Sequence, residues 1–276
     1  MEITFKDLKR LRNYLYNEVG IYVEDEKLEN IYKRKVLKLL QDLEYDNFDT
    51  FFKDLVLKKF SLKQKLINIF TVNETYFFRE KYQFDTLVNL VLPQIDEIRK
   101  KDEVIKILCS PVSTGEELYS IAIMLLEEDN LIRKRDFMLL GIDIDSNVIQ
   151  KAKNGVFSHR SVHKLPQNLI DKYFIKKDDG YHIKDFLKKA CNFKVVNVMD
   201  KYSMKKLGSF DVIFSRNMLI YFDERSKREV IATYHNMLKE NGYLFLGHAE
   251  RISSDIKLFE SIKLGDSFVY KKNTDS

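Results

Sequence analysis

The sequence has few of the features that mark secreted, membrane or disulfide-bonded chains. Only two of its 276 residues are cysteines, Cys109 and Cys191. One pair so far apart is no disulfide framework, so we expect two reduced, buried thiols. No apolar run approaches the roughly 20 residues that span a bilayer, and the N-terminus lacks a signal peptide's apolar core. We therefore expect a cytoplasmic chain.

Dense basic stripes, internal repeats and low-complexity tracts are also missing. The formal charge is +5, with basic and acidic residues interleaved. This mildly favours an acidic partner, but a solvated lysine-rich surface is the simpler interpretation, and no nucleic-acid binding motif is present. His159 and His163 are four residues apart without the glutamate of a zinc protease helix between them, so we predict no metal site.

What the sequence does have is an ordinary globular balance, with 45% hydrophobic and 32% charged residues, and a length that predicts one large and one smaller domain. Residues 1–72 are predicted to form an all-α N-terminal domain of four short helices, the last opened by a capping box at Ser61 and Gln64. Its apolar residues recur at helical spacing: Leu8, Leu11, Leu15 and Val19; Leu28, Ile31, Tyr32, Leu39, Leu40 and Leu43; Phe48, Phe51, Phe52, Leu55 and Val56; Leu62, Leu66, Ile67 and Phe70.

Two further features lie in or next to this domain. On the second helix Lys27, Arg34 and Lys38 share the face opposite the apolar stripe; a solvated face is the default interpretation, and an acidic partner helix is the alternative. The segment Thr71–Glu80 is aromatic and polar and fits neither neighbouring helical pattern. We expect an ordered linker there, followed by a helix that runs into Pro93.

From Val104 onward short apolar runs alternate with amphipathic helices, which predicts an α/β fold with a doubly wound, mostly parallel sheet. The runs are Val104–Cys109, Phe137–Ile142, Phe193–Val198, Phe210–Ser215, Tyr243–Leu246 and Ser267–Tyr270. Residues from about 156 to 192 are too many for a simple crossover and contain the turn signal Asp179-Gly180, so we predict an inserted helix and small antiparallel β-subdomain there. The predicted division is 1–72, a linker at 73–92 that contributes to a ligand site, and 93–276.

A strand, a tight turn and a helix surround the segment Ser113–Glu117, and in doubly wound sheets such a turn is where a nucleotide-like ligand sits. Gly115 is its only glycine, so the dinucleotide fingerprint is not satisfied. Glu116 and Glu117 would repel a phosphate but can accept hydrogen bonds from nucleoside hydroxyls. Compensation of the helix dipole explains the same two acids, so this loop alone does not decide the function.

Asp143 lies at the end of the second predicted strand, some two dozen residues after this loop, where an acid typically binds ribose hydroxyls. Asp143, Asp145 and Asn147 also have the first spacing of a calcium loop. Val148 replaces the glycine of that loop and Asn154 its bidentate acid, which excludes calcium. Asp145 or Ser146 is expected to cap the next helix.

The ends of two other strands carry polar residues. Arg216 and Asn217 follow the fourth strand, and Asn197 lies near the end of the third. Because the carboxyl ends of parallel strands meet at one edge of a sheet, we expect these side chains and Asp143 at the same ligand-binding rim.

Five motifs in this order resemble those of the chemotaxis receptor glutamate methyltransferases (CheR), over almost the whole chain. They are NETYFFR (Asn73–Arg79), STGEE (Ser113–Glu117), DIDSNV (Asp143–Val148), FDVIFSRNMLIYFD (Phe210–Asp223) and LFLGHAE (Leu244–Glu250). The family usually has small residues before STGEE and a proline after it. Here Pro111 and Val112 precede the motif and Leu118 follows it, a difference that affects the loop's shape.

The resemblance implies a Rossmann-like enzyme that transfers the methyl group of S-adenosylmethionine (SAM) to glutamate side chains of methyl-accepting chemotaxis receptors, giving glutamyl methyl esters and S-adenosylhomocysteine. It implies cofactor contacts from Asn73, Thr75, Arg79, Ser113, Gly115, Glu117, Asp143, Asn197, Val198, Arg216 and Asn217. Arg79 and Tyr221 are implied to be catalytic. Asp143 suits the ribose, Asn197 and Val198 the adenine, and Arg79 or Arg216 a carboxylate. The implied partners are the cytoplasmic helical domains of the receptors. The resemblance also implies a monomer that binds no nucleic acid or metal and does not insert into the membrane.

The implied reaction needs no general base, because a glutamate with a pKa of about 4.3 is already ionised at neutral pH. Holding carboxylate, methyl and sulfur in line can supply roughly 7 to 11 kcal/mol. A nucleic-acid methyltransferase and a non-catalytic SAM-binding signalling module are the alternatives. A base-stable product would favour the first, and tight cofactor binding without transfer the second. The short turn at Asp179 predicts no tethering to a receptor's C-terminal peptide.

Overall fold

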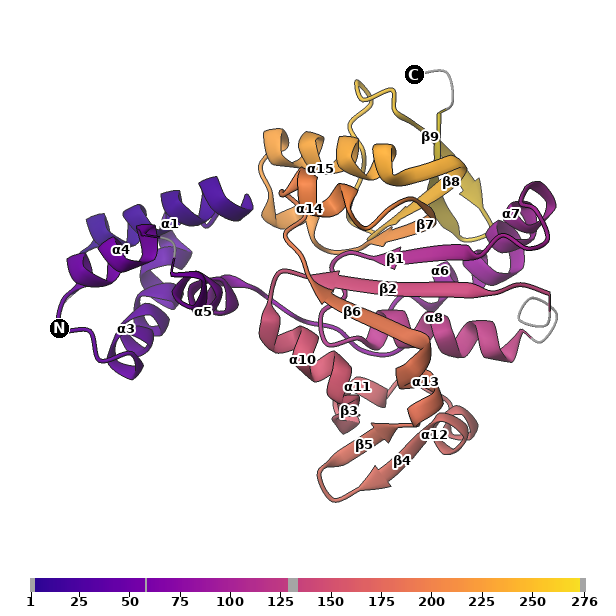
Figure 1. Cartoon of the computed structure of the whole chain (residues 1–276), viewed down its shortest axis with the longest axis horizontal. Coiled ribbons are helices and arrows are strands. Elements are labelled where there is room, and N and C mark those ends of the chain that lie inside the picture. The colour runs from indigo at the N-terminus through magenta and orange to yellow at the C-terminus, as the bar shows by residue number, and fades with distance from the viewer. Residues whose placement is uncertain (1–2, 58, 129–133, 274–276) are drawn as a thin grey trace.

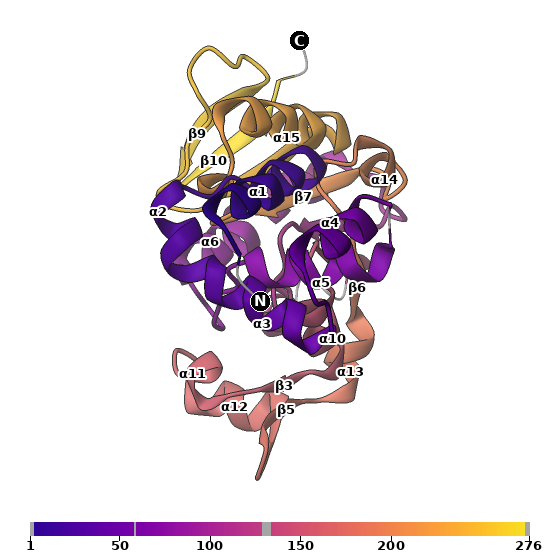
Figure 2. The same ribbon diagram turned by 90° about the vertical axis from the view of Figure 1, so that its left-hand side faces the viewer.

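The computed structural model describes residues 3–57, 59–128 and 134–273. It consists of an N-terminal group of helices, a seven-stranded sheet between helices, and a small three-stranded sheet below the main one in Figure 1. Figures 1 and 2 show the N-terminal helices beside the carboxyl ends of the central strands. None of the helices within the described residues is long and apolar enough to cross a membrane.

The N-terminal helices, here called the helical unit (residues 3–70), bury one shared apolar core. They are α1 (Phe5–Val19), α2 (Asp25–Lys27) continued by a π-helical turn η1 (Leu28–Tyr32) and α3 (Lys33–Asp42), α4 (Phe48–Val56) and α5 (Phe60–Phe70). Thr4 and Asp7 form a capping box at the start of α1, and Gly20 ends that helix at φ 73°. The predicted all-α character of this region is confirmed.

Three details of the helical unit differ from the predictions. Ile31 and Val56 are exposed, although the other apolar residues predicted at helical spacing lie in the core or pack against it. The predicted capping box at Ser61 is wrong, because α5 begins at Phe60 without a side-chain cap. The Gln64 amide instead donates to the carbonyl of Ile144, 2.7 Å away in the α/β part, so a contact between the two parts replaces the local cap.

The main sheet has the strand order β6-β2-β1-β7-β8-β10-β9, in which the first five strands are parallel and β10 is antiparallel to both of its neighbours, β8 and β9. The strands are β1 (Ile105–Cys109), β2 (Phe137–Asp143), β6 (Cys191–Val195), β7 (Phe210–Ser215), β8 (Leu238–Leu246), β9 (Phe259–Leu264) and β10 (Ser267–Lys272). The predicted fold class, a mostly parallel doubly wound sheet, is confirmed. Strand β9 is a strand that the sequence reading missed, and β6 begins and ends earlier than predicted.

Helices cover both faces of this sheet and give it two apolar layers. One face packs against α6 (Lys81–Thr86), its continuations η2 (Leu87–Val91) and α7 (Leu92–Ile98), α8 (Glu116–Glu127) and α10 (Ser146–Asn154); the other packs against α14 (Lys201–Lys205) and α15 (Glu224–Met237). Neighbouring strand residues alternate between the layers, as Ile107 and Leu108 do. Cys109 and Cys191 are buried and free, as predicted.

The predicted β-subdomain is confirmed as a three-stranded antiparallel sheet of order β3-β5-β4. Its elements are β3 (Val156–Phe157), α11 (His159–Val162), α12 (Gln167–Tyr173), β4 (Phe174–Lys177), β5 (Gly180–Ile183) and α13 (Asp185–Ala190). Strands β4 and β5 form a hairpin in which Lys177 pairs with Gly180, so the turn falls where the Asp179-Gly180 signal predicts it.

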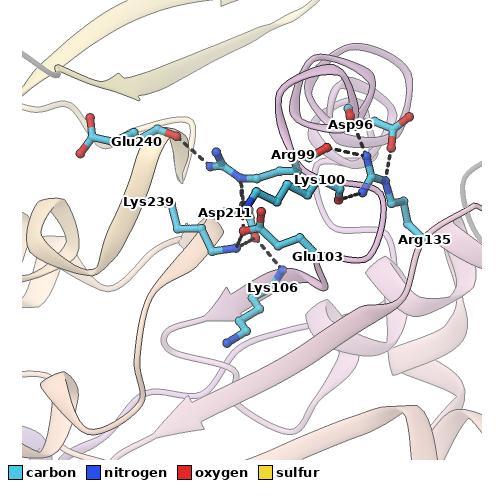
Figure 3. Close-up of polar contacts among 9 residues, drawn as sticks. All are labelled: Asp96, Arg99, Lys100, Glu103, Lys106, Arg135, Asp211, Lys239 and Glu240. Carbon is cyan, nitrogen blue, oxygen red and sulfur yellow. Dashed lines mark hydrogen bonds and ion pairs between the residues drawn. The ribbon is translucent and has the colours of Figure 1, made fainter.

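A buried polar network, drawn in Figure 3, fixes the amino ends of the central strands. These ends are the ones remote from the helical unit in Figure 1. The carboxylate of Asp211, which is 0% exposed, accepts hydrogen bonds from Arg99 Nε (2.6 Å), Lys239 Nζ (2.9 Å) and the backbone N–H of Lys106 (2.8 Å). Beside it, Arg135 donates to carbonyls at the end of α7. The network therefore ties α7 to β1, β7 and β8 and leaves the opposite edge free for a ligand.

Candidate active site

The candidate site lies where the order of the strands reverses. From β1 the chain proceeds outward to β2 and β6, then returns to β7 on the other side of β1. In open α/β sheets the loops after two such strands diverge and leave a crevice at their carboxyl ends. Two adjoining cavities occupy this crevice, with about 680 and 500 Å³ of space, and share the lining residues Val72, Asn73, Pro111, Asp143 and Asn217.

Asp143 holds the loop after β1 against the end of β2. Its Oδ2 accepts from the backbone N–H of Ser113 and its Oδ1 from that of Asp145, both at 2.9 Å. The side chain is 4% exposed, and burial raises the pKa of this carboxyl to about 6, against the lowering effect of the two N–H groups. A carboxylate has about four acceptor sites, and the backbone N–H groups of Ser113, Asp145 and Ile144 do not use all of them, so the carboxylate can also receive a ligand's hydroxyl.

Unlike the other predicted site residues, Gly115 lines neither cavity. It precedes α8 at φ 99°, and an added Cβ would lie 3.0 Å from Ala152 Cβ and 3.1 Å from Tyr119. Only glycine adopts that conformation in so close a contact without strain. Gly115 thus shapes the loop through its backbone. Glu116 is also away from the cavities, buried and hydrogen-bonded to Thr114.

The linker expected between the two predicted domains lies across the crevice. Asp145, which caps α10 as predicted, accepts hydrogen bonds from Thr71 Oγ1 (2.7 Å) and Asn73 Nδ2 (2.9 Å). Farther along, the backbone N–H of Phe78 donates to Ser120 Oγ at 3.1 Å. The linker is therefore fastened to the start of α10 and to α8, and Asn73, Thr75 and Arg79 line the cavities.

Buried charges form the polar end of the site. Arg216 Nη1 is 3.1 Å from Glu117 and its Nη2 is 3.4 Å from Glu80. Nη2 also donates to the carbonyl of Arg79 at 2.6 Å. Burial raises the pKa of Glu117, and the Arg216 charge opposes that rise. Arg216 Nε has no hydrogen-bond partner, and Glu117 Oε1 has only the weakly donating Cys109 thiol beside it. This end of the site therefore has a donor and an acceptor that protein groups do not fully satisfy.

The larger cavity is mostly apolar and is built partly by the helical unit. Val19, Ile21 and Phe70 of that unit face Ile142 and Val198 of the sheet edge across it. No local sequence pattern indicates these three contributions, which depend on how the two parts dock.

Asn197 also lines the larger cavity, and its amide joins the two parts. It donates to the carbonyl of Glu18 at 2.8 Å, while its oxygen accepts from the N–H of Met199 at 3.0 Å. The amide predicted for an adenine edge therefore already has two protein partners.

Tyr221 lies at the mouth of the larger cavity, at the end of the short 3₁₀ turn η3 (Leu219–Tyr221). It is 37% exposed. Partial burial raises its pKa, which the positive charge of Arg79 counteracts. Its carbonyl accepts from the N–H of Tyr22 at 3.3 Å, so the helical unit also borders this mouth.

The structure brings together nearly all the predicted site residues. Asn73, Thr75, Arg79, Ser113, Glu117, Asp143, Asn197, Val198, Arg216, Asn217 and Tyr221 line one or both cavities. Sequence reasoning missed Glu80, whose carboxylate lies between Arg216 and His248, although it directly follows the NETYFFR motif. Within the described part of the chain no group of His, Cys, Asp or Glu side chains is arranged to hold a metal ion.

The cavity pair combines apolar walls, the buried carboxyl of Asp143 and the charges around Arg216, a combination that suits a ligand with a flat ring, vicinal hydroxyls and a zwitterionic end. SAM has these three parts. The fold and the site together define a SAM-dependent methyltransferase.

Comparisons with known proteins agree and narrow this class. The family model described as CheR methyltransferase, SAM binding domain, matches residues 73–268. Chemotaxis protein methyltransferase 2 of Vibrio cholerae is 39% identical, covering 98% of this chain and 94% of its own. The chemotaxis protein methyltransferase of Borreliella burgdorferi is 34% identical, covering 99% and 96%. The chain belongs to the CheR methyltransferase family.

Solved structures add little to this assignment. Magnesium protoporphyrin IX methyltransferase from Synechocystis, solved with bound SAM, aligns over 99% of this chain and 97% of its own with 12% identity and a TM-score of 0.37. So low a similarity says nothing about the substrate.

Proposed function

We propose that this enzyme methylates glutamate side chains of methyl-accepting chemotaxis receptors, giving glutamyl methyl esters and S-adenosylhomocysteine. The observation that carries the proposal is that Arg79 and Tyr221 line the two adjoining cavities, close enough for the Arg79 charge to act on the Tyr221 phenol, in a chain whose relatives are named chemotaxis protein methyltransferases. A guanidinium and a phenol are suitable donors for a substrate carboxylate.

The cofactor contacts follow from the two cavities. We assign the adenine to the apolar cavity with Val198 and Asn197, the ribose to Asp143, and the amino-acid end to Glu117, Arg216 and their neighbours Asn73, Thr75, Ser113 and Asn217. Gly115 contributes through the loop shape. Bound SAM supplies an electrophilic methyl group on sulfur.

The lining residues fit an acidic nucleophile. Neither histidine nor lysine is among the residues that line the two cavities, and the two buried carboxyls there already have partners, Asp143 in backbone N–H groups and Glu117 in Arg216. A glutamate needs no general base because it is already ionised. Arg79 and Tyr221 then orient the carboxylate, and the surrounding walls exclude water.

The partner we propose is the helical cytoplasmic part of a receptor, bound by a monomeric, cytoplasmic enzyme with residues 1–72 acting as a substrate-selecting domain. Lys27, Arg34 and Lys38, which the sequence pattern places on one helix face, are all exposed. A positive face of this kind attracts an acidic helix and speeds its encounter with the enzyme.

The test is incubation with methyl-labelled SAM and receptor-containing membranes, followed by mild alkali. Label released as methanol supports a carboxyl ester, whereas base-stable label would contradict it. Tyr221→Phe should lower turnover about 10- to 100-fold, the loss expected for one hydrogen bond to a charged group, and Arg79→Ala at least as much. Tyr202→Phe, an exposed tyrosine on α14, is the matched control. Unchanged turnover in both test variants would refute these roles.

A further inference from the structure

The LFLGHAE motif lies behind the candidate site without entering it. Leu246 ends β8, and Gly247–Glu250 form a turn closed by the N–H of Glu250 donating to the carbonyl of Gly247 at 2.9 Å. None of the motif's residues lines either cavity. Cofactor or substrate contact therefore does not explain this segment.

Glu250 is the residue through which the turn reaches the site. Its side chain, 4% exposed, accepts three backbone hydrogen bonds. Oε2 accepts from the N–H groups of Asn217 and Gly247, each at 2.8 Å, and Oε1 accepts from Leu219 at 2.7 Å. Two of the three donors belong to the loop after β7, which carries Asn217 and Tyr221.

The two residues of this loop that Glu250 holds, Asn217 and Leu219, both affect the geometry of the loop. Asn217 has φ 58°, a left-handed conformation that asparagine tolerates better than most residues other than glycine, and the hydrogen bond from its N–H to Glu250 holds it there. Leu219 begins the 3₁₀ turn that ends at Tyr221. The carboxylate thus determines the backbone on either side of Met218.

The Glu250 carboxylate is tightly packed. A Cβ added at Gly247 would lie 2.8 Å from Glu250 Oε2 and 2.9 Å from Asn217 Nδ2. The same turn is anchored a second time, because His248 Nδ1 is 3.0 Å from Glu80, whose other oxygen faces Arg216. The turn and the β7 loop therefore form one fitted unit.

We infer that Glu250 is a positioning residue for methyl transfer, whose carboxylate sets the turn that presents Tyr221 to the substrate. The inference rests on the proposed function of Tyr221. Glu250 acts through the backbone of the β7 loop and touches neither the cofactor nor the substrate.

Glu250→Gln separates the contact with Leu219, which sets the Tyr221 turn, from the contact with Asn217. Glutamine has one acceptor oxygen, which can serve Asn217 and Gly247 only if its NH₂ group faces the N–H of Leu219. The Tyr221 turn then loses its acceptor while Asn217 keeps its own. Turnover with labelled SAM and receptor membranes should fall about 10- to 100-fold. S-adenosylhomocysteine affinity, measured by calorimetry, should stay within about threefold. Glu260→Gln, on the exposed side of β9, is the matched control and should change neither.

A double-mutant cycle distinguishes positioning from general support. In a Tyr221→Phe background Glu250→Gln should lower turnover by less than about threefold more, because both changes remove the same oriented hydroxyl. Additive losses would overturn the inference. A Tyr221→Phe enzyme with full activity would instead refute the proposed role of Tyr221.

Thermal unfolding is followed for every variant. If Glu250→Gln does not fold, Glu250→Asp, which keeps the charge on a shorter arm, takes its place in the cycle. Failure of both variants to fold would overturn the inference, since the carboxylate would then serve the whole domain and not the Tyr221 turn.

Discussion

Acidification should weaken cofactor binding through Asp143. Burial raises the pKa of this carboxyl to about 6, so near that pH about half of the cofactor-free molecules carry it protonated. A protonated carboxyl carries its hydrogen at one of the sites that would otherwise accept a ribose hydroxyl, and so loses acceptor capacity for the ligand. The proposed ligand therefore selects the ionised form, and binding below this pKa must release a proton.

The size of the effect follows from the pKa. If only ionised Asp143 binds, affinity is lowered by the factor 1 + 10^(pKa − pH), which is about 2 at pH 6 and about 11 at pH 5, with a plateau above about pH 7. Calorimetric titration with S-adenosylhomocysteine from pH 5 to 8 measures this factor. Repeating it in two buffers of different ionisation enthalpy measures the released proton directly.

Two variants identify the titrating group. Asp143→Asn should bind more weakly but with a flatter pH dependence. Glu117 is the other carboxyl of the site with a pKa raised by burial, and Glu117→Gln should leave the Asp143 component in place. Affinity independent of pH in the unmodified enzyme would refute this reasoning, and so would an equal slope in Asp143→Asn.

Two further predictions concern stability and docking. Asp211→Ala leaves Arg99 and Lys239 without their buried anion and should lower the free energy of unfolding in urea by about 3–5 kcal/mol, whereas exposed Asp102→Ala should change it by less than about 0.5 kcal/mol; equal losses would contradict the role of the network. Gly20→Ala places a Cβ 2.7 Å from the Phe222 ring and should weaken S-adenosylhomocysteine binding several-fold, more than about one kcal/mol in free energy. Gly208→Ala, also at positive φ but with open space around it, isolates backbone strain and should bind normally.

A strand buried on both faces was predicted with its exact bounds, whereas strands that carry polar residues were missed wholly or in part. Every residue of β7 is buried, and its predicted and observed bounds agree. Strand β9 mixes Glu260 and Lys263 with its apolar residues because it lies at the sheet's edge, so it gives no continuous apolar run. The first part of β8 was missed because Lys239 is polar, and its ammonium group is satisfied by Asp211.

The site was predictable where topology alone brings residues together. Asp143, Asn197 and Arg216 follow parallel strands that end at one edge, so their convergence follows from the fold class. The walls supplied by Val19 and Phe70 were not predictable, because those residues read as ordinary core positions of a helical bundle. Whether a buried residue faces its own core or a neighbouring domain depends on docking, which local periodicity does not encode.

Because the helical unit forms part of the apolar cavity, cofactor binding and the docking of this unit are thermodynamically coupled. Tyr16 donates to Asp223 at 2.5 Å and Asn197 to the carbonyl of Glu18 at 2.8 Å, so contacts between the two parts lie beside the wall that Val19 gives to the apolar cavity. A ligand filling that cavity gains contacts with both parts only when they are docked. By linkage, the factor by which docking raises ligand affinity equals the factor by which the ligand stabilises docking. Substitutions at this interface must therefore alter cofactor affinity even where they touch no cofactor atom.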